Sequence, residues 1–209
     1  MLKSLSFPAT ILVCSLAVIA GCGTGQDRSA ATTKATATVP ADANKATSSL
    51  DQVVMSLKSI RDANDQNNLK KLFANLQTHA NGLEGTLADV EASSASAVAA
   101  GKDQIEKWHK DADTFTDADL RKASSQREGE LRKSVDELSS SRSTLATVGT
   151  AYRAKLAETL KALDLDLSQQ GVKSVNAIVS RLINDEPDLR SALTEVAEKS
   201  QAVNKVVRP

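Results

Sequence analysis

The spacing of apolar residues after about residue 47 limits what this chain can fold into. Apolar side chains recur there at intervals of three and four residues, which places them on one face of a helix with 3.6 residues per turn. The first stripe consists of Leu50, Val53, Leu57 and Ile60. Strand-like alternation and hairpin turns rich in glycine or proline are almost absent, so the pattern predicts an all-α fold.

Three longer apolar stripes follow the first one. They extend over residues 69–115, 120–167 and 172–206. At about 1.5 Å per residue, the first of these corresponds to a rod of roughly 65–70 Å. Narrow stripes on long helices must be buried against each other, and short connections near 116 and 170 favour antiparallel neighbours. We therefore expect an elongated, coiled-coil-like antiparallel bundle of three long helices, with residues 47–63 as a shorter N-terminal helix.

Several residues mark helix ends or interruptions in this pattern. The polar run 64–68 is either a tight turn or a weak point in a continuous helix. Thr116 is placed to cap the third helix, and Gly171 is placed to end it in the left-handed conformation. Pro187 lacks an amide hydrogen, so the last helix must kink or restart there, with Asp185 as the cap if it restarts.

Residues 22–46 differ from the helical region in composition. The segment is rich in alanine and threonine, and Val39 is its one large apolar side chain after the cysteine. Such a segment buries too little surface to offset its ordering entropy. We predict a disordered tether, whose flexible coil of roughly 23 residues would span about 25–30 Å.

Residues 1–21 have the features of a secretory signal peptide. Lys3 supplies a positive charge, and the run from Phe7 to Ala20 is apolar apart from Thr10 and Ser15. This run is shorter than the about 20 apolar residues that cross a bilayer. The predicted organisation is a signal peptide at 1–21, a tether at 22–46 and a helical domain at 47–209.

The signal ends in Ile19-Ala20-Gly21-Cys22, which resembles the lipobox of bacterial lipoproteins. The resemblance implies that the signal is cut after Gly21, that Cys22 is diacylated and that its new amino group is acylated. The membrane is then a partner through the lipid on Cys22. Because Gly23 follows the cysteine in place of the aspartate typical of inner-membrane retention, the resemblance favours the periplasmic face of the outer membrane. In an organism with a single membrane it implies the outer cell surface.

Composition argues against several classes of function. The chain has 26 basic and 26 acidic residues, so it lacks the basic excess of a nucleic-acid-binding protein, and we expect no nucleic-acid partner. Its two cysteines are Cys14, within the signal, and Cys22, which leaves no intrachain disulfide or thiol nucleophile in the mature chain. Aromatic residues are too sparse for a platform that stacks bases or sugars.

Catalytic and metal-binding patterns are weak. His79 and His109 would lie about 45 Å apart along one helix, and His79 falls on the apolar stripe, as expected of a half-buried structural histidine. The sequence Glu106-x-x-His109 occurs once, whereas a di-metal bundle needs two copies. Glycine-rich phosphate loops and nucleophile elbows are missing. We predict no catalytic residue, no metal, no cofactor and no small-molecule substrate.

A cluster of charged residues lies at the start of the third predicted helix. Its members are Asp117, Asp119, Arg121, Lys122, Arg127, Glu128, Glu130, Arg132 and Lys133. Most of it is expected to be a solvated face with pairs such as Asp117–Arg121 and Glu128–Arg132. Arg127, however, falls where the stripe requires an apolar side chain, so it needs a carboxylate from another helix or it contacts a partner. We therefore take Arg121, Arg127 and Arg132 as candidate partner contacts.

From about Leu83 onward, the order of landmarks resembles a family of uncharacterised bacterial secreted proteins classed as a domain of unknown function. The residues that carry the resemblance are Val90-Glu91, Trp108, Asp119 to Ser124, Arg127, Leu131, Tyr152, Gly171 and Val172. The resemblance implies a helical coiled-coil architecture and no established activity.

Together these features predict a non-enzymatic, lipid-anchored protein of the cell envelope that acts as a helical scaffold or spacer. The alternative is a partner-binding subunit of an envelope complex concerned with cell-wall or membrane homeostasis. In that case its incomplete apolar stripes would pair with a helix of a partner protein. The expected protein contacts are thus an envelope protein or, separately, self-association.

Overall fold

The computed structural model describes residues 25–208, and four long helices account for nearly all of them. The helices are α1 (Gly25–Arg61), α2 (Gln66–Ala112), α3 (Ala118–Leu165) and α4 (Gln169–Val207). No strand occurs within this range. The predicted all-α class is confirmed.

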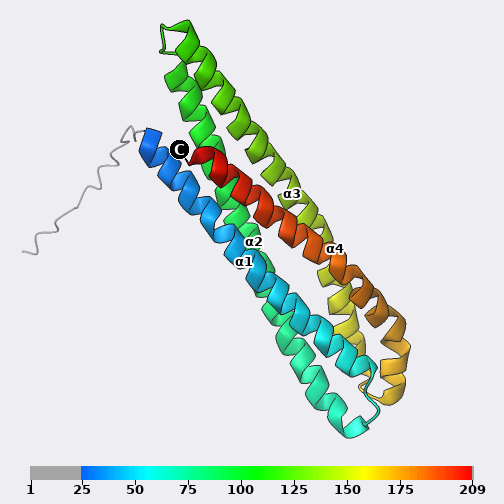
Figure 1. The fold of residues 1–209 in the computed structure, drawn as a ribbon. Coiled ribbons are helices and arrows are strands. Elements are labelled where there is room, and N and C mark those ends of the chain that lie inside the picture. The colour runs from blue at the N-terminus through cyan, green and yellow to red at the C-terminus, as the bar shows by residue number, and fades with distance from the viewer. Residues whose placement is uncertain (1–24, 209) are drawn as a thin grey trace, which may run out of the picture.

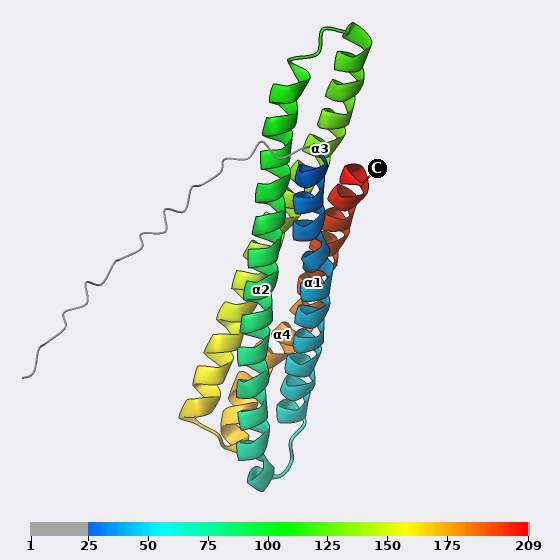
Figure 2. The same cartoon turned by 90° about the vertical axis from the view of Figure 1, so that its left-hand side faces the viewer.

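The helices lie side by side, and the molecule is long and narrow in both views (Figures 1 and 2). α1 packs against α2 and α4, and α3 packs against the same two helices, whereas the backbones of α1 and α3 do not come close to each other. Contacts between α1 and α2 pair residues in opposite order along the chain. Ser56 meets His79, whereas the earlier Thr32 meets the later Ala100.

The core extends along the whole length of the helices. Fully buried leucines from each of the stripes contribute to it, including Leu57, Leu76, Leu138 and Leu193. Several buried serine and threonine hydroxyl groups donate to main-chain carbonyls of their own helix, as in the bonds from Ser141 to Leu138 (3.0 Å) and from Thr159 to Lys155 (2.9 Å). The core thus accommodates small polar side chains without leaving these hydroxyl groups unpaired.

The disordered tether predicted for residues 22–46 is wrong from Gly25 onward, because these residues form the first half of α1. Small side chains of this segment are buried, namely Thr32, Thr36, Val39, Ala43 and Ala46. Alanine is the best helix former, and small side chains let α1 approach α2 and α4, whose larger side chains supply the apolar surface. The helical domain therefore begins at Gly25, not at 47, and its first helix has 37 residues, close to the 39 of α4. Cys22 and the predicted signal peptide lie outside the described residues.

Aspartates cap two of the helices. The chain reverses over residues 62–65, so the polar run 64–68 includes the start of α2, and Asp65 caps that helix by accepting a hydrogen bond from the amide of Asn67 at 2.9 Å. Asp117, and not the predicted Thr116, caps α3, because its carboxylate accepts bonds from the amides of Asp119 and Leu120, both at 2.9 Å. A carboxylate at this position also interacts favourably with the positive end of the helix dipole.

The predicted role of Gly171 is also wrong, since α3 already ends at Leu165 and Gly171 lies in the first turn of α4. Its amide donates to the Ser168 hydroxyl at 3.0 Å, and no described residue has a positive φ. Only glycine fits at this position, because a Cβ atom would lie 1.9 Å from the carbonyl oxygen of Asp166. α4 continues through Pro187, and Asp185 forms an ion pair with Lys155 at 2.6 Å instead of capping a new helix.

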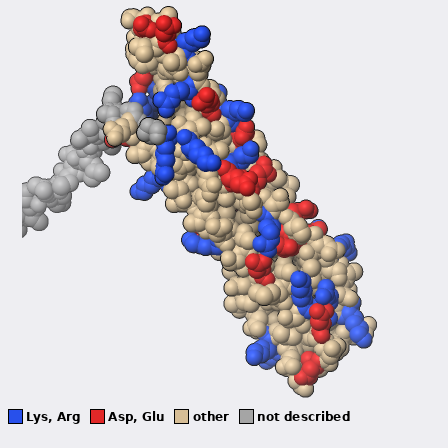
Figure 3. Space-filling view, in the orientation of Figure 1, with Lys and Arg blue, Asp and Glu red and all other residues tan. Residues whose placement is uncertain are grey.

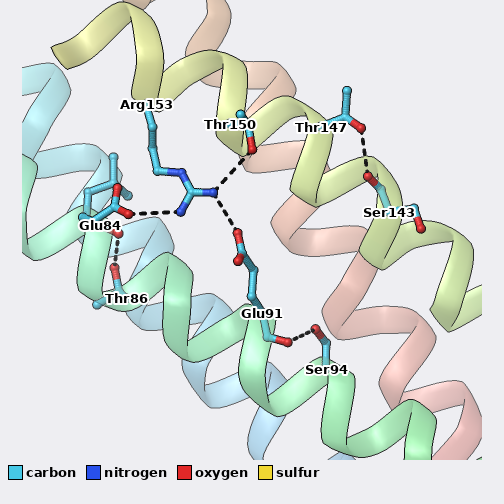
Figure 4. A network of polar contacts seen from close by, with 9 residues as sticks. Glu84, Thr86, Glu91, Ser94, Ser143, Thr147, Thr150 and Arg153 are labelled. Atoms are coloured by element: carbon cyan, nitrogen blue, oxygen red, sulfur yellow. Dashed lines mark hydrogen bonds and ion pairs between the residues drawn. The ribbon is translucent and has the colours of Figure 1, made fainter.

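An arginine of α3 links that helix to two positions of α2 (Figure 4). The Arg153 guanidinium donates to Glu84 at 3.2 Å and to Glu91 at 3.0 Å. These glutamates are seven residues apart, which is two helical turns along one face. The pair of contacts therefore joins α3 to two points on the same face of α2.

Candidate partner surface at the hairpin end

The residues proposed to contact a partner gather at one end of the molecule. There α2 and α3 extend past the first residue of α1 and the last residue of α4 as a hairpin (Figures 1 and 2). None of residues 118–127 is buried, and the first buried residue of α3 is Glu128. This hairpin end consequently has little core of its own. Figure 3 shows basic and acidic side chains intermixed on the visible face.

Arg127 does not occupy the core position that the sequence pattern assigned to it. It is exposed, and its guanidinium lies over the indole ring of Trp108, 5.5 Å from the ring centroid. The Trp108 indole nitrogen donates to the Ser124 hydroxyl at 2.7 Å. Cation–π stacking and this hydrogen bond together hold the half-buried indole between α2 and α3.

Glu128 occupies the core register in place of Arg127. Its carboxylate accepts a bond from Arg132 at 2.6 Å and lies 3.2 Å from Nδ1 of His109. Burial alone would raise the pKa of the Glu128 carboxyl, but the hydrogen bonds from Arg132 and His109 outweigh burial and lower that pKa below its ordinary value. The predicted Glu128–Arg132 pair is thus present. Arg132 mainly neutralises a buried carboxylate.

Arg121 secures the loop at the end of the hairpin. Its guanidinium donates to the main-chain carbonyl of Phe115, so the predicted pair with Asp117 is replaced by this contact and by the capping role of Asp117. Phe115 and Leu120, which the stripes assigned to the interior, are 37% and 59% exposed. The end of the hairpin therefore presents two large apolar side chains to its surroundings.

A pocket with a volume of about 440 Å³ opens beside the hairpin where the ends of α1 and α4 meet α2 and α3. Its walls include Arg28, Gln104, Trp108, Phe115, Arg127 and Val207. Arg28 also forms an ion pair with Asp111. Gln104 is 4% exposed, and its Oε1 atom accepts no hydrogen bond from the described residues. An apolar wall with charged margins suits the binding of an apolar group or a side chain.

The histidines are engaged in separate contacts far apart. His79 is half-buried, as expected, with its Nδ1 2.8 Å from the Ser56 hydroxyl. Glu106 pairs with Lys110 at 2.7 Å, whereas His109 faces Glu128. Within residues 25–208, no group of three or more metal-binding side chains comes together.

No family model matches the chain, and no curated protein gives a significant match. Among the helices described, none combines the length and apolar character needed to cross a membrane. The geometry of the hairpin end and the sequence before α1 therefore provide the basis for assigning a function.

Proposed function

We propose that this protein is a non-enzymatic lipoprotein of the cell envelope, attached to its membrane through acylated Cys22 and acting as a rigid spacer or scaffold. The domain would be an elongated, antiparallel, coiled-coil-like bundle. The single observation that supports this most is the position of α1, whose first residue, Gly25, is only three residues after Cys22.

This short interval changes the expected relation between the domain and the membrane. Three residues span at most about 10–11 Å when fully extended, which is well below the span of the tether that composition suggested. The rod would therefore start beside the lipid. Because α3 has 48 residues, its far end would stand up to about 72 Å from the membrane if the rod is upright.

The state of the carboxylates supports a non-enzymatic role. General acids need a raised pKa in a dry site. Glu128, the one buried carboxylate among the described residues, instead has a lowered pKa because of Arg132 and His109. Glu106 and Asp185 are held in ion pairs with lysines.

The membrane that holds the anchor depends on the envelope of the host cell. In a proteobacterial envelope, Gly23 favours the periplasmic face of the outer membrane. In a cell with one membrane, the same anchor would place the rod on the outer surface. The anchoring chemistry and the spacer function are the same in both cases.

Palmitate labelling with membrane fractionation tests the anchor. The full chain should take up label and sediment with membranes, and Cys22→Ser should lose both properties. Cys14→Ser is the matched control, because it removes the other cysteine within the signal and should keep both. Labelling or membrane association that survives Cys22→Ser contradicts the proposal.

Small-angle scattering of the soluble Cys22→Ser chain without its signal tests the spacer. A rod about 72 Å long has a radius of gyration of about 22 Å, whereas a compact domain of this size has about 16 Å. A value near the compact limit contradicts a spacer role.

The alternative is a partner-binding subunit of an envelope complex, and the pocket at the hairpin end favours it. A photoreactive residue placed at Gln104 or Trp108, which line that pocket, should form adducts with another envelope protein in intact cells. Photoreactive residues at Met55, which is 59% exposed and outside the pocket, provide the control. Only self-adducts, or none, would count against this alternative.

A further inference from the structure

The exposed apolar residues of the hairpin lie at the end of the molecule where α1 begins. Ser29 of α1 meets Gln104 of α2, and Thr32 meets Ala100. Since the two helices run in opposite directions, extrapolating this register places Gly25 level with about Trp108. The hairpin thus extends past the start of α1 by the rest of α2 and the loop at 113–117.

The interval from Gly25 to Cys22 matches this extension. The four residues that follow Trp108 in α2, up to Ala112, rise about 6 Å, and the loop adds to that height. Three extended residues reach about 10–11 Å. An acyl group on Cys22 can therefore lie at the same level as the hairpin loop, which brings the loop to the surface of the bilayer.

The loop region has the side chains that such a surface accommodates. Phe115 and Leu120 are 37% and 59% exposed. Two other large apolar side chains among the described residues are at least as exposed as Phe115: Met55 on α1, and Leu165 at the opposite end. Apolar side chains gain free energy by entering the boundary between headgroups and acyl chains.

Charge near the loop is slightly acidic, with five acidic and four basic residues between 106 and 122. The basic residues from 106 to 122 are Lys107, Lys110, Arg121 and Lys122, and the acidic ones are Glu106, Asp111, Asp113, Asp117 and Asp119. Binding through phosphate attraction alone would need a basic excess. The apolar side chains, and not the net charge, would therefore drive contact with lipid.

We propose that the loop between α2 and α3 inserts Phe115 and Leu120 into the headgroup layer of the membrane that holds Cys22. This inference rests on the proposed lipid anchor. The rod then has two points of attachment at one end, the acyl group and the loop. Two attachments restrict tilting of the rod, which a single flexible linkage permits.

Spin labels on introduced cysteines test this contact. When Cys22 is acylated, Phe115→Cys and Leu165→Cys each carry the one free thiol of the mature chain, because Cys14 leaves with the signal. The lipidated protein is reconstituted in vesicles of phosphatidylethanolamine and phosphatidylglycerol. The label at 115 should be accessible to oxygen, which concentrates in the bilayer, and protected from a water-soluble nickel reagent. The label at 165 should show the opposite.

Equal accessibility to the nickel reagent at both positions overturns the insertion and leaves the anchor intact. Spin labelling of the parent chain with no introduced cysteine would mean that the Cys22 thiol is free, which instead contradicts the proposed function. A second variant checks the apolar contribution. Leu120→Ser should increase nickel accessibility at position 115 by about threefold or more, whereas Met55→Ser should leave it unchanged.

Discussion

The side-chain hydroxyl of Ser200 in α4 donates a hydrogen bond of 2.8 Å to the main-chain carbonyl of Thr36 in α1. In a regular helix that carbonyl would accept the amide of residue 40, but residue 40 is Pro40 and has no amide hydrogen. Ser200 and Thr36 are 0% and 1% exposed. The serine of α4 therefore supplies the partner that proline removes from α1, within the segment that composition marked as a tether.

Ser200→Ala should reduce the free energy of unfolding by about 1–3 kcal/mol, because it leaves a buried carbonyl unpaired. The cost should shrink in a Pro40→Ala background, where the new amide can bond to Thr36. Urea unfolding in the unacylated Cys22→Ser chain measures both values. Ser140→Ala is the control, because its exposed hydroxyl bonds only within α3. Equal costs in the two backgrounds would contradict this account.

Gly101→Ala should destabilise the fold by about 1–3 kcal/mol through overpacking. A Cβ atom at Gly101 would lie 2.5 Å from Cγ2 of Val135, where α2 and α3 meet. Gly82, on the same helix, has open space around the corresponding position. Gly82→Ala should therefore stabilise the protein by up to about 1 kcal/mol. Thermal unfolding compares the two, and Val135→Ala should rescue part of the Gly101→Ala defect.

The ionisation of Glu128 should make the free energy of unfolding depend on pH in the acid range. Its pKa in the folded state is below the ordinary 4.5, so the ionised carboxylate contributes stability above about 4.5, and this contribution is lost as the pH falls through the lower, folded-state pKa. Glu128→Gln should therefore lose less stability on acidification than the parent chain. Urea unfolding at a series of pH values measures the slope. A slope in Glu128→Gln equal to that of the parent chain would contradict this account.

Tyr152→Phe should leave stability at neutral pH unchanged or increase it. Tyr152 is 2% exposed, and its hydroxyl has no hydrogen-bond partner among the described residues. Removing the hydroxyl therefore removes the free-energy cost of burying an unpaired polar group. Burial raises the pKa of Tyr152, and the charges of Glu186 and Asp185 raise it further above the ordinary 10.0. The parent should lose stability above about pH 10, where the unfolded chain ionises first. Because Tyr152 is the one tyrosine, phenolate absorbance reports its titration directly.

Hydrogen exchange should be fastest within α3 over residues 118–127. That stretch has no buried residue, whereas Leu131 to Leu163 contribute regularly to the core. Local opening needs less free energy where little apolar surface is buried. Mass spectrometry of peptides from both parts of α3 measures the difference, and equal protection would show that an unrecognised contact covers the hairpin end.

The helices could be predicted after residue 47 because their stripes consist of large apolar side chains. The first half of α1 follows the same periodicity with small ones: Thr32, Thr36, Val39, Ala43 and Ala46 are spaced four, three, four and three residues apart. Composition suggested disorder, whereas spacing predicts a helix. Packing against two neighbouring helices provides the burial that the segment lacks alone.

The candidate surface was only partly predictable. The sequence pointed to the basic residues of the third helix, but it placed Arg127 in the core, and the buried position belongs to Glu128. A pattern that is defined by apolar residues does not identify Glu128 as a core position, because a carboxylate can be buried only when a partner such as Arg132 neutralises it. The pocket could not be predicted at all, because residues as distant as Arg28 and Val207 line it together, and only the packing of four helix ends brings them close.

The small side chains of α1 also determine how its two halves respond to mutation. Leu50, Leu57 and Ile60 are core positions that require bulk, and truncation there leaves cavities. Ala43 and Ala46, at 2% and 0% exposed, have the opposite requirement, an upper limit on size. Larger apolar residues at these two positions would push α1 away from its neighbours although they raise the hydrophobicity of the segment. The half of α1 nearest Cys22 thus requires small side chains at its buried positions, and the other half requires large ones.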